Sequence, residues 1–195
     1  METYSQSARD IFQTEIMILK GEKIVLRPMR LNDAPRFVKW LADQQVNKFT
    51  TRRPISLKEE KKWIRSLSGK KDEIHFAIDT GDGIHIGSIG LEIQKRDRKA
   101  DFDILIGDKD YWDKGYGTDA ATAILDYGFK KLKLHRIFLR VFKFNKRVIK
   151  VYKRLGFKYE GMGREAVLSG GKFYDLVYMG ILHREWRRGK LKRSR

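Results

Sequence analysis

The sequence predicts an α/β domain built around a mixed sheet in which antiparallel hairpins dominate. Two strand-like stretches meet at Asp82-Gly83 and two more meet at Gly170-Gly171, and both dipeptides are strong hairpin signals. Between these hairpins, over 100–157, segments with strand periodicity alternate with segments with helix periodicity. A chain of 195 residues fits one domain with a substantial core.

The first half of the chain predicts two helices between strands. "KIVLRPM" (23–29) is rich in β-formers and ends at proline, so we expect a strand there. A helix follows with Asn32 as its cap, and "SLKE" (56–59) has the capping-box pattern that begins a second helix. "IHFAID" and "IHIGSIGLEI" then form the first hairpin around "TGDG".

The second half predicts two more helices and three more strands before its final turn. "ADFDILI" (100–106) is expected to be a strand, and the good helix formers after "DKGYG" predict a helix over 118–133. "RIFLRVF" (136–142) alternates as a half-buried strand does, and "NKRVIKVYKRLGF" (145–157) is an amphipathic helix stopped by glycine. "GREAVLSGGKFYDLVYMGIL" (163–182) forms the second hairpin.

Composition excludes several classes of protein. There are no cysteines, so disulfides, thiolate metal sites and a cysteine nucleophile are ruled out. We expect a cytoplasmic protein without membrane association, because no secretory segment is visible and no apolar run approaches the ~20 residues that span a bilayer.

The formal charge of +18 favours polyanionic partners, and one basic cluster, "HREWRRGKLKRSR" (183–195), stands at the C-terminus. A solvated basic surface explains the same charge, and both interpretations stay open.

Gly115 and Gly117 raise the first question about function. They follow Lys114, after a strand and before a helix, where unpaired backbone N–H groups and the helix dipole favour an anion. A sharp turn between strand and helix is the alternative explanation. The spacing is neither that of a nucleotide P-loop nor that of a dinucleotide-binding fingerprint.

Asn145 and Tyr152 lie seven residues apart, two turns of one helix, and therefore share a face. The structural alternative is that Asn145 caps the helix and Tyr152 packs against the sheet, which is the more common role of a lone tyrosine.

Together these stretches resemble the GNAT superfamily of acetyl-CoA-dependent N-acetyltransferases, and within it the RimJ/RimL branch. The resemblance runs from about residue 23 to residue 186 and includes "LRPM", "PISLKEEKKWI", "IGSIGLEI", "YWDKGYGTDAA", "NKRVIKVYKRLGFKYEGMGRE" and "GKFYDLVYMGIL". It implies a single GNAT-type domain over 21–186, with an N-terminal extension (1–20) and a basic tail (187–195). The implied sheet is mixed and mostly antiparallel, with about seven strands and about four helices, and is splayed between the fourth and fifth strands.

The resemblance also implies how acetyl-CoA binds. The pantetheine arm would lie along the strand that carries Ile104, Leu105 and Ile106, and Asn145 and Tyr152 would complete its site. The pyrophosphate would contact the amides of Trp112, Lys114, Gly115, Tyr116, Gly117 and Thr118. Many members of the superfamily have Arg or Gln where this chain has Trp112, but the RimJ/RimL branch commonly has Trp there.

Catalysis in this family implies an acid and a base. The family position of the general base matches Asp101, where relatives usually have Glu; Asp103 and Glu92 are further candidates, and an ordinary surface role for each stays open. Tyr152 matches the family's tyrosine acid, and a backbone N–H near Leu105 would stabilise the oxyanion. The four histidines show no spacing typical of metal ligands, so we expect no metal.

The acceptor amine is predicted only by charge. Lys48, Arg52 and Arg53 suit an acceptor with acidic or phosphate groups, so a peptide or protein N-terminus of the ribosomal type is the first expectation. A small amine, namely a polyamine, amino sugar or aminoglycoside, is the alternative, with polyamines disfavoured by these cations. A non-catalytic RNA-associated protein on the same fold is the alternative from another class. A weak association of the basic surface with RNA, and a homodimer, are further expectations.

Overall fold

The computed structural model describes residues 17–52 and 54–186, and it contains eight strands and five α-helices within those ranges. Three short 3-10 helices, one of them Leu31–Asp33, complete the secondary structure. In chain order the strands and α-helices are β1 (Leu19–Lys20), β2 (Ile24–Pro28), α1 (Ala34–Ala42), α2 (Gln44–Asn47), α3 (Leu57–Leu67), β3 (Glu73–Thr80), β4 (His85–Gln94), β5 (Lys99–Ile106), α4 (Tyr116–Lys130), β6 (Arg136–Phe142), α5 (Lys146–Leu155), β7 (Lys158–Ser169) and β8 (Lys172–Leu182).

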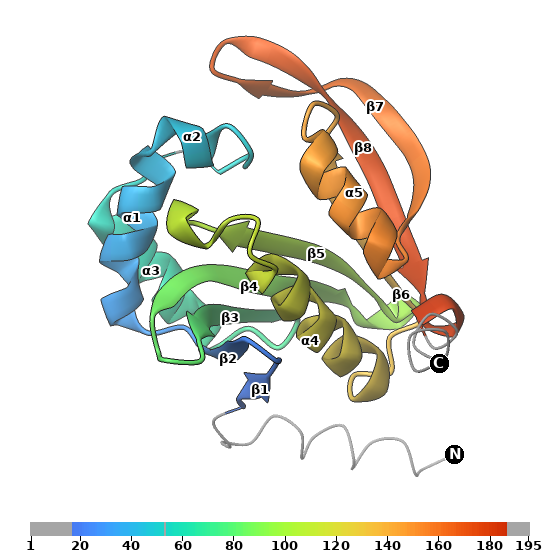
Figure 1. The fold of residues 1–195 in the computed structure, drawn as a ribbon, viewed down its shortest axis with the longest axis horizontal. Helices are drawn as coiled ribbons and strands as arrows, with labels where there is room; N and C mark the ends of the chain where they lie inside the picture. Colours follow the sequence, from blue (N-terminus) through green and yellow to red (C-terminus); the bar gives the residue numbers. More distant parts are fainter. Residues whose placement is uncertain (1–16, 53, 187–195) are drawn as a thin grey trace.

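All eight strands form one sheet in the order β1-β2-β3-β4-β5-β6-β8-β7. Neighbouring strands are antiparallel except β5 and β6, which pair in parallel over three residue pairs, from Lys99↔Arg136 to Asp101↔Phe138. Beyond Asp101 the two strands diverge, and the sheet opens between them (Figure 1). The predicted splay is therefore confirmed. The fourth and fifth predicted strands correspond to β5 and β6, because the structure has one additional strand, β1, before the first predicted strand.

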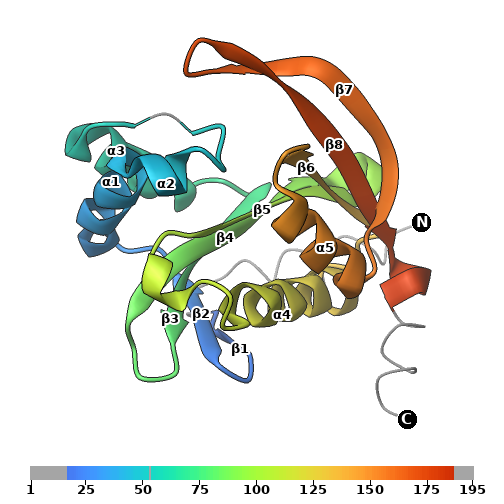
Figure 2. The ribbon, with the colours of Figure 1, turned by 45° about the horizontal axis from the view of Figure 1, so that its top comes forward.

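Helices cover the sheet on both faces. In Figure 2, α4 and α5 lie on one face, while α1 and α3 lie on the other face of the β1–β5 half. The main core, which includes Phe102, Ile124 and Phe129, fills the space under α4 and α5, and a second cluster of Phe37, Trp40 and Val46 forms under α1 and α2. In the part of the chain that is described, no helix is long and apolar enough to cross a membrane.

Local signals explain most of the element boundaries. At the start of α3 the Ser56 hydroxyl accepts from the Glu59 amide, and the Glu59 carboxylate accepts from the Ser56 amide, which is the predicted capping box. The α5 helix ends at Gly156 in the left-handed conformation, with φ of 102°. Both predicted hairpins are present, β3–β4 and β7–β8.

Three details differ from the sequence prediction. The sheet has eight strands instead of about seven, because two residues of the expected N-terminal extension, Leu19 and Lys20, pair with β2. Asn32 is not the cap of α1: it lies inside the 3-10 helix, and Asp33 occupies the N-cap position. The helix expected over 118–133 begins earlier and ends earlier, at Tyr116–Lys130.

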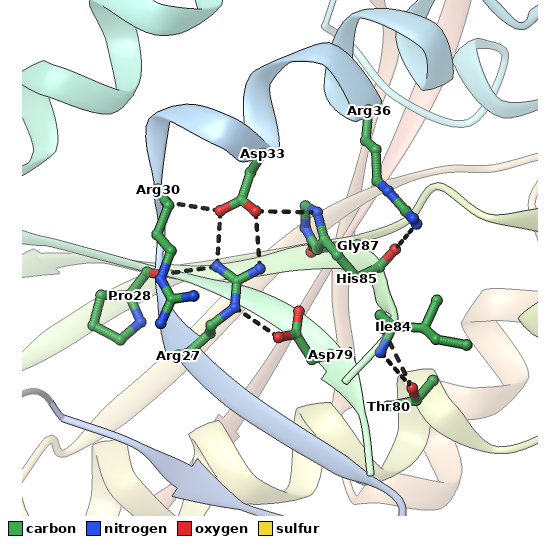
Figure 3. A network of polar contacts seen from close by, with 10 residues as sticks. All are labelled: Arg27, Pro28, Arg30, Asp33, Arg36, Asp79, Thr80, Ile84, His85 and Gly87. Carbon is green, nitrogen blue, oxygen red and sulfur yellow. Dashed lines mark hydrogen bonds and ion pairs between the residues drawn. The ribbon is translucent and has the colours of Figure 1, made fainter. Parts of the chain in front are cut away.

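A buried polar network ties α1 to the sheet (Figure 3). The Arg27 guanidinium donates to both carboxylate oxygens of Asp33 at 2.8 Å and, through Nε, to Asp79 at 2.6 Å. His85 completes the network, with Nδ1 at 3.4 Å from the Asp33 carboxylate and Nε2 at 2.9 Å from the Gly87 carbonyl. The network therefore joins β2, β3 and β4 to the beginning of α1.

Candidate active site

The opening between β5 and β6 leaves one edge of β5 without a strand partner from Phe102 to Ile106, among the residues described. Ile104 and Ile106 pack with the main core on the α4 side, whereas Leu105 packs with the second cluster under α1. The strand segment predicted to receive the pantetheine arm is thus the segment with a free edge. An extended amide chain can pair with such an edge as a strand would.

The glycine loop joins this strand to α4. Gly115 is the N-cap residue of α4 and has φ of 87°, a conformation that L side chains rarely adopt. A Cβ at Gly117, by contrast, would make ordinary contacts, the nearest 3.5 Å from Ile106 Cγ1. Gly115 therefore serves the turn itself, and the turn directs the N-terminus of a 15-residue helix toward the open end of the splay.

Contacts with the β1–β2 turn hold the loop in place. The Asp119 carboxylate accepts from the backbone amides of Glu22, Lys23 and Ile24, at 3.1, 2.7 and 3.2 Å. The Lys23 ammonium donates to the Lys114 carbonyl at 3.1 Å and lies over the Tyr116 ring, 5.8 Å from its centroid. Lys23 thus brings a second cation to the glycine loop, which sequence spacing did not reveal because it lies about 90 residues upstream.

A pocket of about 410 Å³ lies at the open end of the splay. Two of its lining residues, Trp112 and Asn145, were predicted to contact the cofactor, whereas the six others were not: Gln45, Lys48, Phe49, Phe144, Lys146 and Arg147. The Arg147 guanidinium lies over the Trp112 ring at 5.1 Å and pairs with Asp113 at 2.6 Å. Aromatic walls with three cations suit a ligand that is partly apolar and carries negative charge.

Tyr152 lies on α5, buried beside the splay. Its ring contacts Phe102 and Phe157, with centroids 6.0 and 5.7 Å apart. Burial raises the pKa of the phenol, and the negative charge of Asp103 raises it further, so the hydroxyl stays protonated at neutral pH. Asn145, on the same helix face, caps α5 by accepting from the Val148 amide at 3.3 Å.

The three candidate bases share the opposite face of the sheet. Glu92 pairs in register with Asp101, and Asp103 follows Asp101 by two residues. The Asp101 carboxylate binds Arg140 at 2.6 Å and is 18% exposed, whereas Asp103 is 61% exposed. Burial raises the pKa of Asp101, and the charge of Arg140 opposes that rise. The structure thus brings all three carboxylates together beside the splay.

The cations of the expected acceptor loop are partly engaged. Arg52 pairs with the buried Glu60 at 2.9 Å and lies over the Trp63 ring at 4.7 Å. Lys48 lies over the Phe49 ring at 4.8 Å and lines the pocket, and Arg53 falls outside the described residues. Across 17–52 and 54–186, no group of three His, Asp or Glu side chains could hold a metal ion.

Comparisons with known proteins agree with this geometry. At the level of sequence, the chain is 28% identical over 175 residues to the Uncharacterized N-acetyltransferase p20 of Bacillus licheniformis, covering 86% of this chain and 97% of that protein. It is 33% identical over 117 residues to the Spermidine N(1)-acetyltransferase of Escherichia coli K12, covering 60% of this chain and 62% of that protein.

At the level of structure, the spermidine N-acetyltransferase of Vibrio cholerae, solved in complex with CoA and spermine, superposes with a TM-score of 0.79. The two are 25% identical, and the match covers 84% of this chain and 98% of that chain. The family model Acetyltransferase (GNAT) domain matches residues 23–158, well over half of the chain. The chain therefore belongs to the GNAT acetyltransferases and is an acetyl-CoA-dependent N-acetyltransferase.

Proposed function

We propose that this enzyme transfers the acetyl group directly to a primary amine on an acceptor that carries further positive charge. The observation that carries the proposal is the placement of Glu92, Asp101 and Asp103 on the face of the splay opposite Tyr152 and the glycine loop. Carboxylates attract an ammonium group, and they lie where an amine could meet an acetyl group held in the opening. Donor and acceptor would then approach from opposite faces of the sheet.

The donor site fits acetyl-CoA in three respects. The edge of β5 beyond Asp101 is free to pair with the amide groups of pantetheine. The amides from Trp112 to Thr118 lie at the start of α4, where the helix dipole favours the pyrophosphate. Lys23, Lys114, Lys146 and Arg147 add positive charge around this path. When bound, acetyl-CoA supplies the activated thioester.

Asp103 and Tyr152 have complementary roles in the proposed reaction. Asp103 takes one proton from the acceptor ammonium, so that the neutral nitrogen can form the C–N bond as the C–S bond breaks. Tyr152 gives its hydroxyl proton to the departing sulfur. Once the C–N bond has formed, the nitrogen loses a second proton, which returns to the Tyr152 oxygen and restores the phenol. The proton on Asp103 leaves to solvent. A backbone N–H near Leu105 would stabilise the negative charge that develops on the carbonyl oxygen.

Two kinds of acceptor share this chemistry. A protein or peptide N-terminus of the ribosomal type stays the first prediction, but its expected charge is reversed: the carboxylates on this face favour a basic peptide over the acidic acceptor that the loop cations suggested. A polyamine is the second, because Arg52, one of the cations that disfavoured it, is paired with Glu60. Glu92 and Asp103, beside the Asp101–Arg140 pair, offer carboxylates for further ammonium groups.

The test is thiol release from acetyl-CoA with spermidine, with basic peptides and with acidic peptides that begin in alanine or serine. We expect the basic peptides or spermidine to support turnover and the acidic peptides to fail. Turnover with acidic peptides alone would contradict the role of the carboxylate face.

Tyr152→Phe tests the proposed acid. It should lower kcat by roughly 10- to 1,000-fold while leaving the affinity for CoA nearly unchanged, because only the proton donor is removed. Tyr127→Phe is the matched control, since Tyr127 is also buried and its pKa is also raised by burial, but it lies in the C-terminal half of α4. Equal losses in both variants would refute a specific role for Tyr152.

A further inference from the structure

Three residues form a row across the sheet on the acceptor face. His75 on β3 pairs in register with Gly90 on β4, and Gly90 pairs in register with Asp103 on β5. Residues that are directly opposite each other in antiparallel strands share a face, so the His75 and Asp103 side chains flank Gly90 on the same side. The His75 Nδ1 atom lies 4.0 Å from the Asp103 Oδ1 atom.

Gly90 allows this approach because it has no side chain. A Cβ at this position would lie 2.4 Å from His75 Nδ1 and 2.7 Å from Asp103 Oδ1, closer than real Cβ contacts. Both side chains therefore lean into the space above Gly90. Gly90 has neither the turn position nor the positive φ that explains Gly115, so its role here is to leave room between its two neighbours.

The other carboxylates are placed differently. Asp101 is bound to Arg140. Glu73, on the other side of His75, lies 3.8 Å from His75 Nε2 and has both oxygens bound to Lys70 at 2.8 Å. Asp103 is exposed, and the His75 ring lies beside its carboxylate, with Nδ1 4.0 Å from Oδ1. It is also the carboxylate whose charge acts on Tyr152. The Asp103 carboxylate thus lies beside His75, and its charge acts on the proposed acid across the strand.

We propose that His75 positions the Asp103 carboxylate and keeps it ionised, so that Asp103 is the proton acceptor for the amine. The proposal rests on the proposed function, because Asp103 is the base of that reaction and His75 is the residue proposed to support it. His75 takes no proton from the substrate. Its imidazole is 13% exposed and is held by the Trp63 ring, with centroids 5.3 Å apart, so its position is fixed by α3.

The charged groups around Asp103 predict in which direction the pKa of its carboxyl moves when a neighbour is substituted. Desolvation raises the pKa of the Asp103 carboxyl; the charges of His75 and Arg52 oppose that rise, and the charge of Glu73 adds to it. Tyr152, on the opposite face, remains neutral, whereas Glu92 and the Asp101–Arg140 pair lie on the same face as Asp103. Removing His75 or Glu73 should therefore move the titration of Asp103 in opposite directions.

The first experiment compares pH profiles of kcat/KM for the wild-type enzyme, His75→Gln and Glu73→Gln. In H75Q the acid limb should move to higher pH, with about a tenfold loss on that limb and recovery toward wild type at higher pH. In E73Q the acid limb should move to lower pH. Asp103→Asn should lose 10²- to 10⁴-fold at every pH, because the proton acceptor is gone. A uniform loss in H75Q with an unmoved acid limb would show a purely structural role and overturn the proposal.

The second experiment needs no turnover. The carboxyl carbon of Asp103 is followed by NMR titration in the full-length protein and assigned by its loss in D103N. Its midpoint should rise in H75Q and fall in E73Q; an unchanged midpoint in H75Q would overturn the proposal even in an active enzyme. If the midpoints move as expected while no amine supports thiol release, the proposed function fails and the pairing of His75 with Asp103 stands.

Discussion

At the scale of single residues, the two glycines of the loop before α4 have separate purposes. Gly115 is required by its φ of 87°, and Gly117 is not required by backbone conformation or by packing, since a Cβ there meets ordinary contacts. Gly117 lies in the first turn of α4, where the backbone amides have no partners within the helix. A side chain would stand between those amides and a bound phosphate, which gives glycine a reason to be there.

Gly117→Asp should therefore affect stability and affinity in opposite directions. An aspartate in the first turn of a helix favours the helix by roughly 0.3–1 kcal/mol, because it complements the dipole. The same charge should weaken CoA binding by roughly tenfold or more, through repulsion of the phosphates. Calorimetric titration with CoA and urea unfolding measure the two effects, and Gly117→Ala separates the side chain from its charge. Unchanged affinity in G117D would refute the placement of the pyrophosphate.

At the scale of elements, the sequence predicted those that are defined by local signals. The capping box at Ser56, the turns at Asp82-Gly83 and Gly170-Gly171, and the glycine after α5 act within a few residues, so a pattern reveals them. Two of the three errors come from contacts between elements, which no local pattern reveals. The β1–β2 turn is held by Asp119, about 95 residues away, and the Asp33 carboxylate that begins α1 is fixed by Arg27.

The candidate site divides in the same way. Tyr152, Asn145 and the glycine loop were predicted through resemblance, and the shared face of Asp101 and Asp103 follows from strand periodicity. His75 was not predicted as a site residue, because its relation to Asp103 depends on the register of three strands and on the missing side chain of Gly90. Lys48, at the end of α2, and Arg147, on α5, line the same pocket. Sequence spacing could not predict this, because the two residues are about 100 positions apart.

The network that joins β2, β3 and β4 to α1 predicts a pH dependence of stability. Burial lowers the pKa of His85 despite the opposing charge of Asp33, so the unfolded chain binds a proton near pH 6.5 that the native protein does not bind. Stability should therefore fall as the pH drops from 7 to 5, with a slope from this residue of at most about 1.4 kcal/mol per pH unit.

His85→Gln isolates this contribution. The glutamine amide can keep a donor toward the Gly87 carbonyl without titrating, so urea unfolding of H85Q should show a shallower loss between pH 7 and pH 5. Asp33 is present in both proteins and cancels in the comparison. A wild-type protein that gains stability over H85Q on acidification would show instead that His85 is protonated and paired with Asp33 in the native state.

At the scale of the whole molecule, the sheet consists of two parts joined by a short parallel ladder. The β1–β5 part carries α1 to α4, the β6–β8 part carries α5, and only three residue pairs of β5 and β6 connect them within the described sheet. The proposed donor path lies across this junction: the free edge of β5 and the glycine loop belong to one part, Asn145 and Tyr152 to the other. A ligand bound there would replace the missing strand contacts between the two parts.

CoA should consequently stabilise the whole domain. At 100 times its Kd, mass action adds about 2.7 kcal/mol to the free energy of unfolding. For a chain of this size that corresponds to a rise of about 5–10 °C in Tm. Hydrogen exchange should slow most at the amides of 102–106 and of the first turn of α4, where the proposed contacts are made. The G117D variant is the control: with affinity tenfold weaker, the same CoA concentration adds only about 1.4 kcal/mol, so its rise in Tm should be about half that of the wild type. If CoA raised the Tm while exchange at these amides stayed the same, the ligand would bind away from the splay, and the two parts would not be bridged by it.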